Sequence, residues 1–281
     1  VREGAHRAGI SVSRKIGAAS KATVTFLLES GSPLMHVTVD LDWREPETLL
    51  KLLFPTRYAA TSARFGSPFG SVLRSQVPNG LQAEAMWEAP FSRYLAVFDE
   101  GEREGFFLAT ESKYGASVRE GSIGLSLVRS PRVTGFDAHS HAWPPHLTRL
   151  KIDSPFSDLG THSIRLAVGR YEVGLPRERQ PASVAETLFT RPITYTGEAL
   201  TGVFESLEGG DTLVPIWVKP IKGGGLVLRL HEVAGGRGSL KLKLREGYHL
   251  QQTDMGESCV KTLDGEVAFT PYEVVSLRVV P

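Results

Sequence analysis

The chain has 281 residues, of which 41% are hydrophobic and 22% are charged, and its 32 basic and 31 acidic side chains give a net charge of +1. A globular protein of this size buries its own core without disulfides or metal staples. The near-neutral balance and the lack of a basic run argue against nucleic acid or an anionic membrane surface as a partner. No apolar run approaches the roughly 20 residues of a membrane-spanning helix.

The single cysteine, Cys259, cannot form an internal disulfide. This favours a reducing compartment, and we predict a cytoplasmic location. We interpret Cys259 itself as a small structural residue, because nothing near it in the sequence resembles an activating base. The chain begins at Val1 with a polar stretch instead of a signal peptide, and we expect that it was cut from a longer protein.

Most of the sequence has the alternating and β-branched composition of strands, separated by Gly, Pro and Ser turns. Predicted strands in the first part of the chain span residues 22–28, 35–39, 39–43, 49–55, 105–110, 123–128 and 164–171. Those of the last part span residues 212–218, 225–232, 239–244 and 273–279. The pattern predicts an all-β fold of large antiparallel sheets packed face to face, followed by a smaller β-unit.

Helix signals are few. Residues 46–51 could form one helical turn with Pro46 at its first position, and residues 182–189 could form a short helix. The segments 131–157 and 174–192 read as loops, the first containing one strand-like stretch at 147–152. We therefore predict a large domain over 1–175, a Pro-rich linker over 176–193 and a small β-sandwich over 194–281.

Few residues suggest chemistry. His139, His141 and His146 follow Asp137 in one Pro-rich segment, where a metal site is possible but solvated loop histidines are the favoured interpretation. The glycine clusters at 223–225 and 235–238 join β-segments, so they predict hairpin turns and not phosphate-binding loops. No nucleophile elbow is present, and we predict no catalytic residue and no metal ligand in this chain.

Four tryptophans divide into two groups. We predict Trp43 and Trp217 in the core, and we name Trp87 and Trp143 as candidates for an exposed stacking face.

Short motifs in a fixed order resemble the C-terminal β-region of glycoside hydrolase family 38, the α-mannosidases. Residues 39–45 and 49–55 are similar to its V-D-W-x-E and L-L-K-x-x-F-P segments, and residues 125–131 match L-S-L-L-R-S-P at six of seven positions. The remaining matches, in chain order, are residues 63–74, 113–115, 158–162, 228–238, 253–257 and 271–274. Each motif is weak alone, and their shared order carries the resemblance.

The resemblance implies a super-sandwich like that of galactose mutarotase, followed by a small β-sandwich. Family members hydrolyse α-mannosides with retention, using an aspartate nucleophile and a divalent metal, usually zinc, in an N-terminal catalytic domain that this chain lacks. The resemblance therefore implies that the chain alone has no hydrolase activity. Its partners would be its own N-terminal catalytic domain and a mannose-containing oligosaccharide.

The resemblance also implies three candidates for the substrate groove: Arg129, Asp158 and His162. Each has a structural alternative. Arg129 could pair with a neighbouring carboxylate, Asp158 could form a tight turn before Gly160, and His162 could make a structural hydrogen bond. The chain departs from the family by an insertion over 131–157 and by Ala116-Ser117 after the K-Y-G motif.

Two other functions remain open from the sequence. One is a stand-alone carbohydrate-binding module that uses exposed aromatic side chains. The other is a mutarotase-like sugar epimerase that transfers protons with a His and Glu pair.

Overall fold

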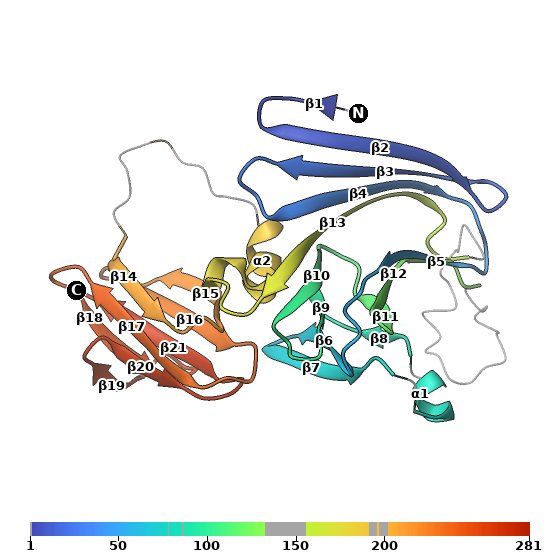
Figure 1. Cartoon of the computed structure of the whole chain (residues 1–281). Coiled ribbons are helices and arrows are strands. Elements are labelled where there is room, and N and C mark those ends of the chain that lie inside the picture. Colours follow the sequence, from blue (N-terminus) through green and yellow to red (C-terminus); the bar gives the residue numbers. More distant parts are fainter. Residues whose placement is uncertain (1, 78, 86, 133–155, 191–195, 197–201) are drawn as a thin grey trace, which may run out of the picture. The chain divides into compact units, whose positions relative to one another are not determined.

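The computed structural model describes residues 2–77, 79–85, 87–132, 156–190, 196 and 202–281. Nearly all of the regular structure is antiparallel β-sheet, which confirms the predicted fold class (Figure 1). The chain forms two compact units, each assembled from separate segments of the sequence. The first unit comprises 1–57, 78–90 and 110–170, and the second comprises 58–77, 91–109 and 171–281.

Long strands dominate the first unit. Its strands β1, β2, β3, β4 and β13 are neighbours in that order, with bounds Arg2–Glu3, Arg7–Ile16, Ser20–Glu29, Leu34–Trp43 and Gly160–Glu172. Alternation in β4 turns Val37, Val39, Leu41 and Trp43 inward, and each is at most 2% exposed. These side chains form part of the hydrophobic core on one face of the sheet, and Trp43 is the last residue of β4.

A second sheet of the first unit has the order β5-β12-β11-β8. Its bounds are Leu49–Pro55, Ser122–Arg129, Gly115–Arg119 and Ala89–Pro90, and the short helix α1 (Leu81–Ala85) precedes β8. Strand β12 is largely buried, and its last residue, Arg129, pairs with Leu49 at the start of β5. The register of β5 against β12 thus fixes where Arg129 leaves the sheet.

The second unit contains a sheet segment and a small sandwich. The segment has the order β10-β9-β6-β7, with bounds Glu104–Thr110, Tyr94–Phe98, Ser62–Ser67 and Gly70–Ser75. The 3₁₀ turn η2 (Arg177–Arg179) and the helix α2 (Pro181–Leu188) follow β13. All five residues of β9 are buried, as expected of a central strand.

The small sandwich packs a three-stranded sheet on a five-stranded one. The first has the order β14-β17-β20, with bounds Phe204–Gly209, Gly238–Leu244 and Glu266–Phe269. The second has the order β15-β16-β21-β18-β19, with bounds Leu213–Pro220, Leu226–Glu232, Val274–Val280, His249–Thr253 and Cys259–Leu263. Leu240, Leu242 and Leu277 are among the buried residues of the shared core, at most 3% exposed.

Most predicted elements are confirmed, including all four strands of the last part and the helix at 182–189. The predicted glycine turn at 223–225 is confirmed, since all three residues have φ between 90° and 96°. The predicted helical turn at 46–51 is wrong: Glu47 has φ of 54° and a strand begins at Leu49. The Glu47 amide donates instead to the Ser130 carbonyl at 2.7 Å, which closes a turn between sheet strands.

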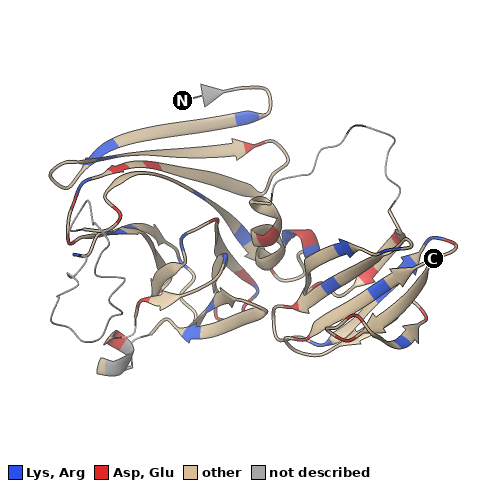
Figure 2. Ribbon diagram, turned by 180° about the vertical axis from the view of Figure 1, so that it is seen from behind, with Lys and Arg blue, Asp and Glu red and all other residues tan. Residues whose placement is uncertain are grey.

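The predicted domains are continuous segments of the sequence, with boundaries at 175 and 194. Each compact unit instead combines three segments that are separated in the sequence. That division stays a prediction. Basic and acidic residues both occur along the described strands of each unit (Figure 2). Within the described residues, no helix has the length and apolar character needed to cross a membrane.

Candidate functional site

Arg129 lies at the rim of an open depression of about 370 Å³ in the first unit. The other lining residues are Glu47, Thr48, Leu49, Pro131 and Arg132. The Arg129 side chain is exposed, and among the described residues none forms a hydrogen bond or ion pair with its guanidinium group. A guanidinium with its donors available suits recognition of hydroxyl or ring oxygens.

Ser130 anchors the end of β12 beneath this depression. Its hydroxyl accepts a hydrogen bond from Trp43 Nε1 at 2.8 Å and donates to the Glu45 carbonyl at 2.5 Å. Its amide donates to the Thr48 carbonyl at 3.0 Å. Ser130 and Trp43 are at most 1% exposed, so this network fixes the backbone that carries Arg129.

The Glu45 carboxylate fixes the same turn from the other side. Its Oε1 accepts the amides of Ala19 and Ser20 at 2.8 and 3.0 Å and the Ser20 hydroxyl at 3.1 Å. The hydrogen bond from the Ala19 amide is the largest of the effects that lower the pKa of Glu45 from its usual value. Glu45 therefore stays ionised and serves the turn between β4 and β5.

Asp158 and His162 follow Ser157, which contacts the end of β12. The Ser157 hydroxyl donates to the Arg129 carbonyl at 3.3 Å, and Asp158 follows with φ of 54°. His162 Nε2 lies 2.8 Å from the Asp158 carbonyl, not from its carboxylate. The structure thus brings the segment before Asp158 into contact with Arg129, and His162 makes the structural hydrogen bond that its alternative predicts.

The depression beside Arg129 is lined by side chains that can form hydrogen bonds. Glycoside hydrolysis needs two carboxyl groups that flank the scissile bond, about 5–9.5 Å apart. The lining of the depression holds one carboxylate, that of Glu47, and the guanidinium groups of Arg129 and Arg132. Such a set can donate to and accept from sugar hydroxyls, but it offers no acid–base pair.

Sequence reasoning missed Glu47 and Arg132 as lining residues. Glu47 lies in the turn before β5, whose first residue, Leu49, pairs with Arg129. Arg132 follows Arg129 by three residues and forms an antiparallel bridge with Phe156. The pairing of 49–55 with 122–129 would have found them, because residues that flank paired strand ends meet at one edge. Neither strand pairing nor register was available from periodicity alone.

Another depression, of about 570 Å³, lies in the small sandwich of the second unit. It is lined by strands β14, β17 and β20 and by the turn around Tyr248 and His249. None of the three predicted groove residues contributes to it. Its lining is ordinary mixed-charge surface of the small sandwich, including Lys241 and Glu266.

The predicted roles of the tryptophans are partly wrong. Trp43 is core, at 1% exposed, but Trp217 is 42% exposed, because it lies on β15 at the edge of its sheet. Trp87 is half-buried, with the Arg119 guanidinium 5.2 Å from its ring centroid. Trp143 lies outside the described residues.

The possible histidine metal site at 137–146 also lies outside the described residues. Within the part of the chain that the structure describes, no group of three or more His, Cys, Asp or Glu side chains could hold a metal ion. Cys259 is free and exposed at the start of β19.

The chain is similar to known proteins of one family. Residues 1–134 match the model of the glycosyl hydrolases family 38 C-terminal domain. Alpha-mannosidase 2C1 of Homo sapiens is 26% identical over 276 residues, and that of Mus musculus is 31% identical over 114 residues. These alignments cover 93% and 40% of this chain but 24% and 11% of the relatives, so the chain spans about a quarter of their length at most.

Two solved structures share the fold. An alpha-mannosidase from Enterococcus faecalis V583 superposes with a TM-score of 0.69 at 16% identity, covering 92% of this chain and 29% of that one. A glycosyl hydrolase family 38 protein from Enterococcus faecalis gives a TM-score of 0.63 at 15% identity, covering 92% and 30%. The predicted resemblance to the C-terminal β-region is thereby confirmed.

Proposed function

Because residues 1–134 match the glycosyl hydrolases family 38 C-terminal domain, we propose that this chain supports and partly lines the mannoside-binding groove of an α-mannosidase. Catalysis would be carried by an N-terminal domain outside this chain. The single observation that carries the proposal is the exposed Arg129 guanidinium, held on a rigid backbone beside an open depression. A mannose-containing oligosaccharide is the proposed ligand.

Arg129 would act in binding and not in bond cleavage. Its guanidinium presents several N–H donors in a fixed plane, which suits paired hydroxyl groups of a sugar. Arg132 would add donors, and Glu47 would accept from hydroxyls on the same rim. Asp158 and His162 would hold the backbone behind this rim, since their contact uses the Asp158 carbonyl.

A divalent metal, zinc by family resemblance, would sit in the catalytic domain. The described residues of this chain do not fit such an ion, because no cluster of suitable ligands is present among them. No step of the proposed role therefore passes through a metal. The cytoplasmic location stays a prediction from cysteine usage, and the epimerase alternative has no particular support from the described side chains.

Replacing Arg129 tests the groove role. In a full-length enzyme that carries this chain, we expect Arg129→Ala to lower kcat/KM for an α-mannoside about 10–100-fold, since charged hydrogen bonds contribute about 1.5–3 kcal/mol each. The effect should come mainly from KM if the contact is equal in ground and transition states. Steady-state kinetics on an aryl α-mannoside and on a mannose oligosaccharide would measure it.

The matched control for this variant is Arg119→Ala, an exposed arginine of the same unit that pairs with Glu84 and stacks on Trp87. We expect its kinetics to stay within about twofold of the wild type, as for most exposed ion pairs. Unchanged kinetics for Arg129→Ala would contradict the groove role.

The chain by itself should be neither a hydrolase nor a metalloprotein. We expect no release of product from an aryl α-mannoside, and we expect EDTA to leave its melting temperature unchanged within about 1 °C, because metals stabilise only folds that bind them. Differential scanning calorimetry with and without EDTA measures this. A clear fall in melting temperature would point to His139, His141 and His146 as ligands after all.

A further inference from the structure

Trp217 marks an exposed polar and aromatic surface on the second unit that the groove proposal does not use. It lies on β15, the edge strand of the five-stranded sheet, opposite Arg229 on β16. Its side chain shares a face of the sheet with Lys219, because residues two apart in a strand point the same way. Large aromatic side chains with this exposure are common at binding surfaces.

Two cations lie over the indole ring of Trp217. The Arg229 guanidinium carbon lies 5.0 Å from the ring centroid, and Lys219 Nζ lies 5.2 Å from it. Both cations contact the same oxygen, Oε1 of Glu257, at 3.4 and 2.6 Å. A shared acceptor holds the two cations together beside Trp217, which stays 42% exposed.

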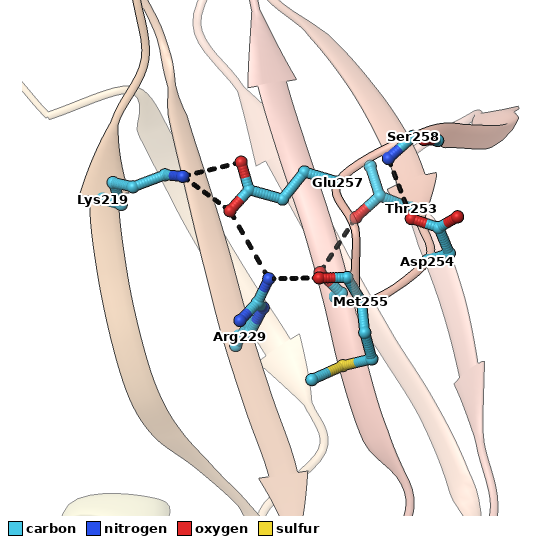
Figure 3. A network of polar contacts seen from close by, with 8 residues as sticks. Lys219, Arg229, Thr253, Asp254, Met255, Glu257 and Ser258 are labelled. Carbon is cyan, nitrogen blue, oxygen red and sulfur yellow. Dashed lines mark hydrogen bonds and ion pairs between the residues drawn. The ribbon is translucent and has the colours of Figure 1, made fainter.

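The loop between β18 and β19 holds Glu257 in place (Figure 3). The Glu257 amide donates to the Asp254 carbonyl at 3.1 Å, and the Asp254 carboxylate accepts the Ser258 amide at 2.9 Å. Arg229 Nη2 also donates to the Met255 carbonyl at 2.9 Å. Glu257 itself has φ of 67°, a conformation that non-glycine residues keep only where surrounding contacts enforce it.

We propose that Trp217, with Lys219 and Glu257 at its edge, is a binding platform for a neutral saccharide built of pyranose units. One face of a pyranose ring carries C–H bonds, which pack on the electron-rich face of an indole. The hydroxyls around that ring need donors and acceptors, which Lys219 and Glu257 supply at 38% and 25% exposed. The platform belongs to the second unit and Arg129 to the first, and the proposal does not depend on the proposed groove.

A saccharide fits these observations better than an apolar partner. Next to Trp217 on β15, Val218 pairs with the core residue Leu228 and points to the other face of the sheet, whereas Trp217 pairs with Arg229. A single ring bordered by charged groups matches one sugar unit in size and polarity. Because the polar groups already hold one another, little ordering is needed on binding.

Titration of the isolated chain with α-mannobiose, and with cellobiose for comparison, tests the proposal. Tryptophan fluorescence and NMR shifts should show saturable binding with a dissociation constant in the millimolar range, as expected for a small ligand on an open surface. Trp217→Ala should weaken that binding at least about tenfold. Glu257→Gln should weaken it about threefold, because the support for both cations loses its charge.

Val218→Ala is the matched control, since Val218 is the next residue of β15, is 54% exposed and points to the opposite face. Its affinity should equal that of the wild type, and circular dichroism should show that every variant is folded. Lack of saturation at millimolar sugar, or equal affinity in Trp217→Ala, would overturn the proposal. So would self-association that Trp217→Ala abolishes without any sugar binding, since this would assign the face to a protein contact.

Discussion

Replacing Trp43 with alanine should destabilise the first unit by about 3–5 kcal/mol, the range for large aromatic truncations in a core. Trp43 is 1% exposed at the end of β4, and its Nε1 donates to Ser130 Oγ at 2.8 Å. The substitution therefore creates a cavity and leaves a buried hydroxyl without its donor. Because domains have total stabilities of about 5–15 kcal/mol, this loss is a large fraction of the whole.

Urea denaturation followed by circular dichroism measures the change, with transitions of the two units analysed separately where they are resolved. Trp87→Ala is the matched control: Trp87 belongs to the same unit but is half-buried, so its loss should cost clearly less. An equal cost for the two variants would contradict the role given to Trp43.

A double-mutant cycle separates the hydrogen bond from the packing. Trp43→Phe keeps much of the apolar volume but removes the donor, while Ser130→Ala removes the acceptor. If the contact contributes as the geometry indicates, the two changes together should cost less than the sum of the single changes by about 1 kcal/mol. Strict additivity would show that Ser130 acts only through its bond to the Glu45 carbonyl.

The fold class was predictable from the sequence because the alternation of apolar residues and the residues that form turns are local properties of the chain. The run Ser239 to Leu244 alternates leucine and lysine, and the structure buries Leu240 and Leu242 while it exposes the lysines. The alternation of residues does not predict how the sheets are arranged. That arrangement was predicted from the order of the family motifs. Glu232 and Tyr272, in two such motifs, prove to be in direct contact, since the Tyr272 amide donates to Glu232.

What could not be predicted depends on contacts between segments distant in sequence. Trp217 has the composition of a core strand around it, yet β15 lies at a sheet edge, and edge position follows from strand order alone. Pro46 suits the first turn of a helix, but the Ser130 carbonyl accepts the Glu47 amide and holds a strand-to-strand turn instead. The lining residues Glu47 and Arg132 were missed for the same reason.

The second large effect should come from Glu232, a carboxylate with no exposed surface at the end of β16. It accepts the amides of Ala234, Gly235 and Tyr272 at 2.9, 2.8 and 2.9 Å. Glu232→Gln keeps the shape but loses the charge and turns an NH₂ group toward backbone donors. We expect a loss of about 2–3 kcal/mol in the stability of the second unit, because buried donors are left without partners.

Glu273→Gln is the matched control, since Glu273 accepts the Thr270 amide at 2.8 Å in an exposed turn of the same unit. Its loss should cost about 0.5 kcal/mol or less, because water can replace the bond. Urea denaturation at pH 7 would compare the two variants. Similar small losses for both would mean that the turn at 234–236 does not depend on the Glu232 charge.

The same carboxylate predicts the acid sensitivity of the second unit. Burial raises the pKa of Glu232, but the hydrogen bonds from Tyr272, Ala234, Gly236 and Thr212 outweigh it and lower the pKa below its usual value of 4.5. A carboxyl group whose pKa is lower in the folded state contributes stability above pH 4.5, and this contribution is lost as the pH falls from 4.5 through the folded-state pKa. The stability of the wild type should therefore drop over that range by more than that of Glu232→Gln, whereas parallel pH profiles would show that Glu232 is not the group responsible.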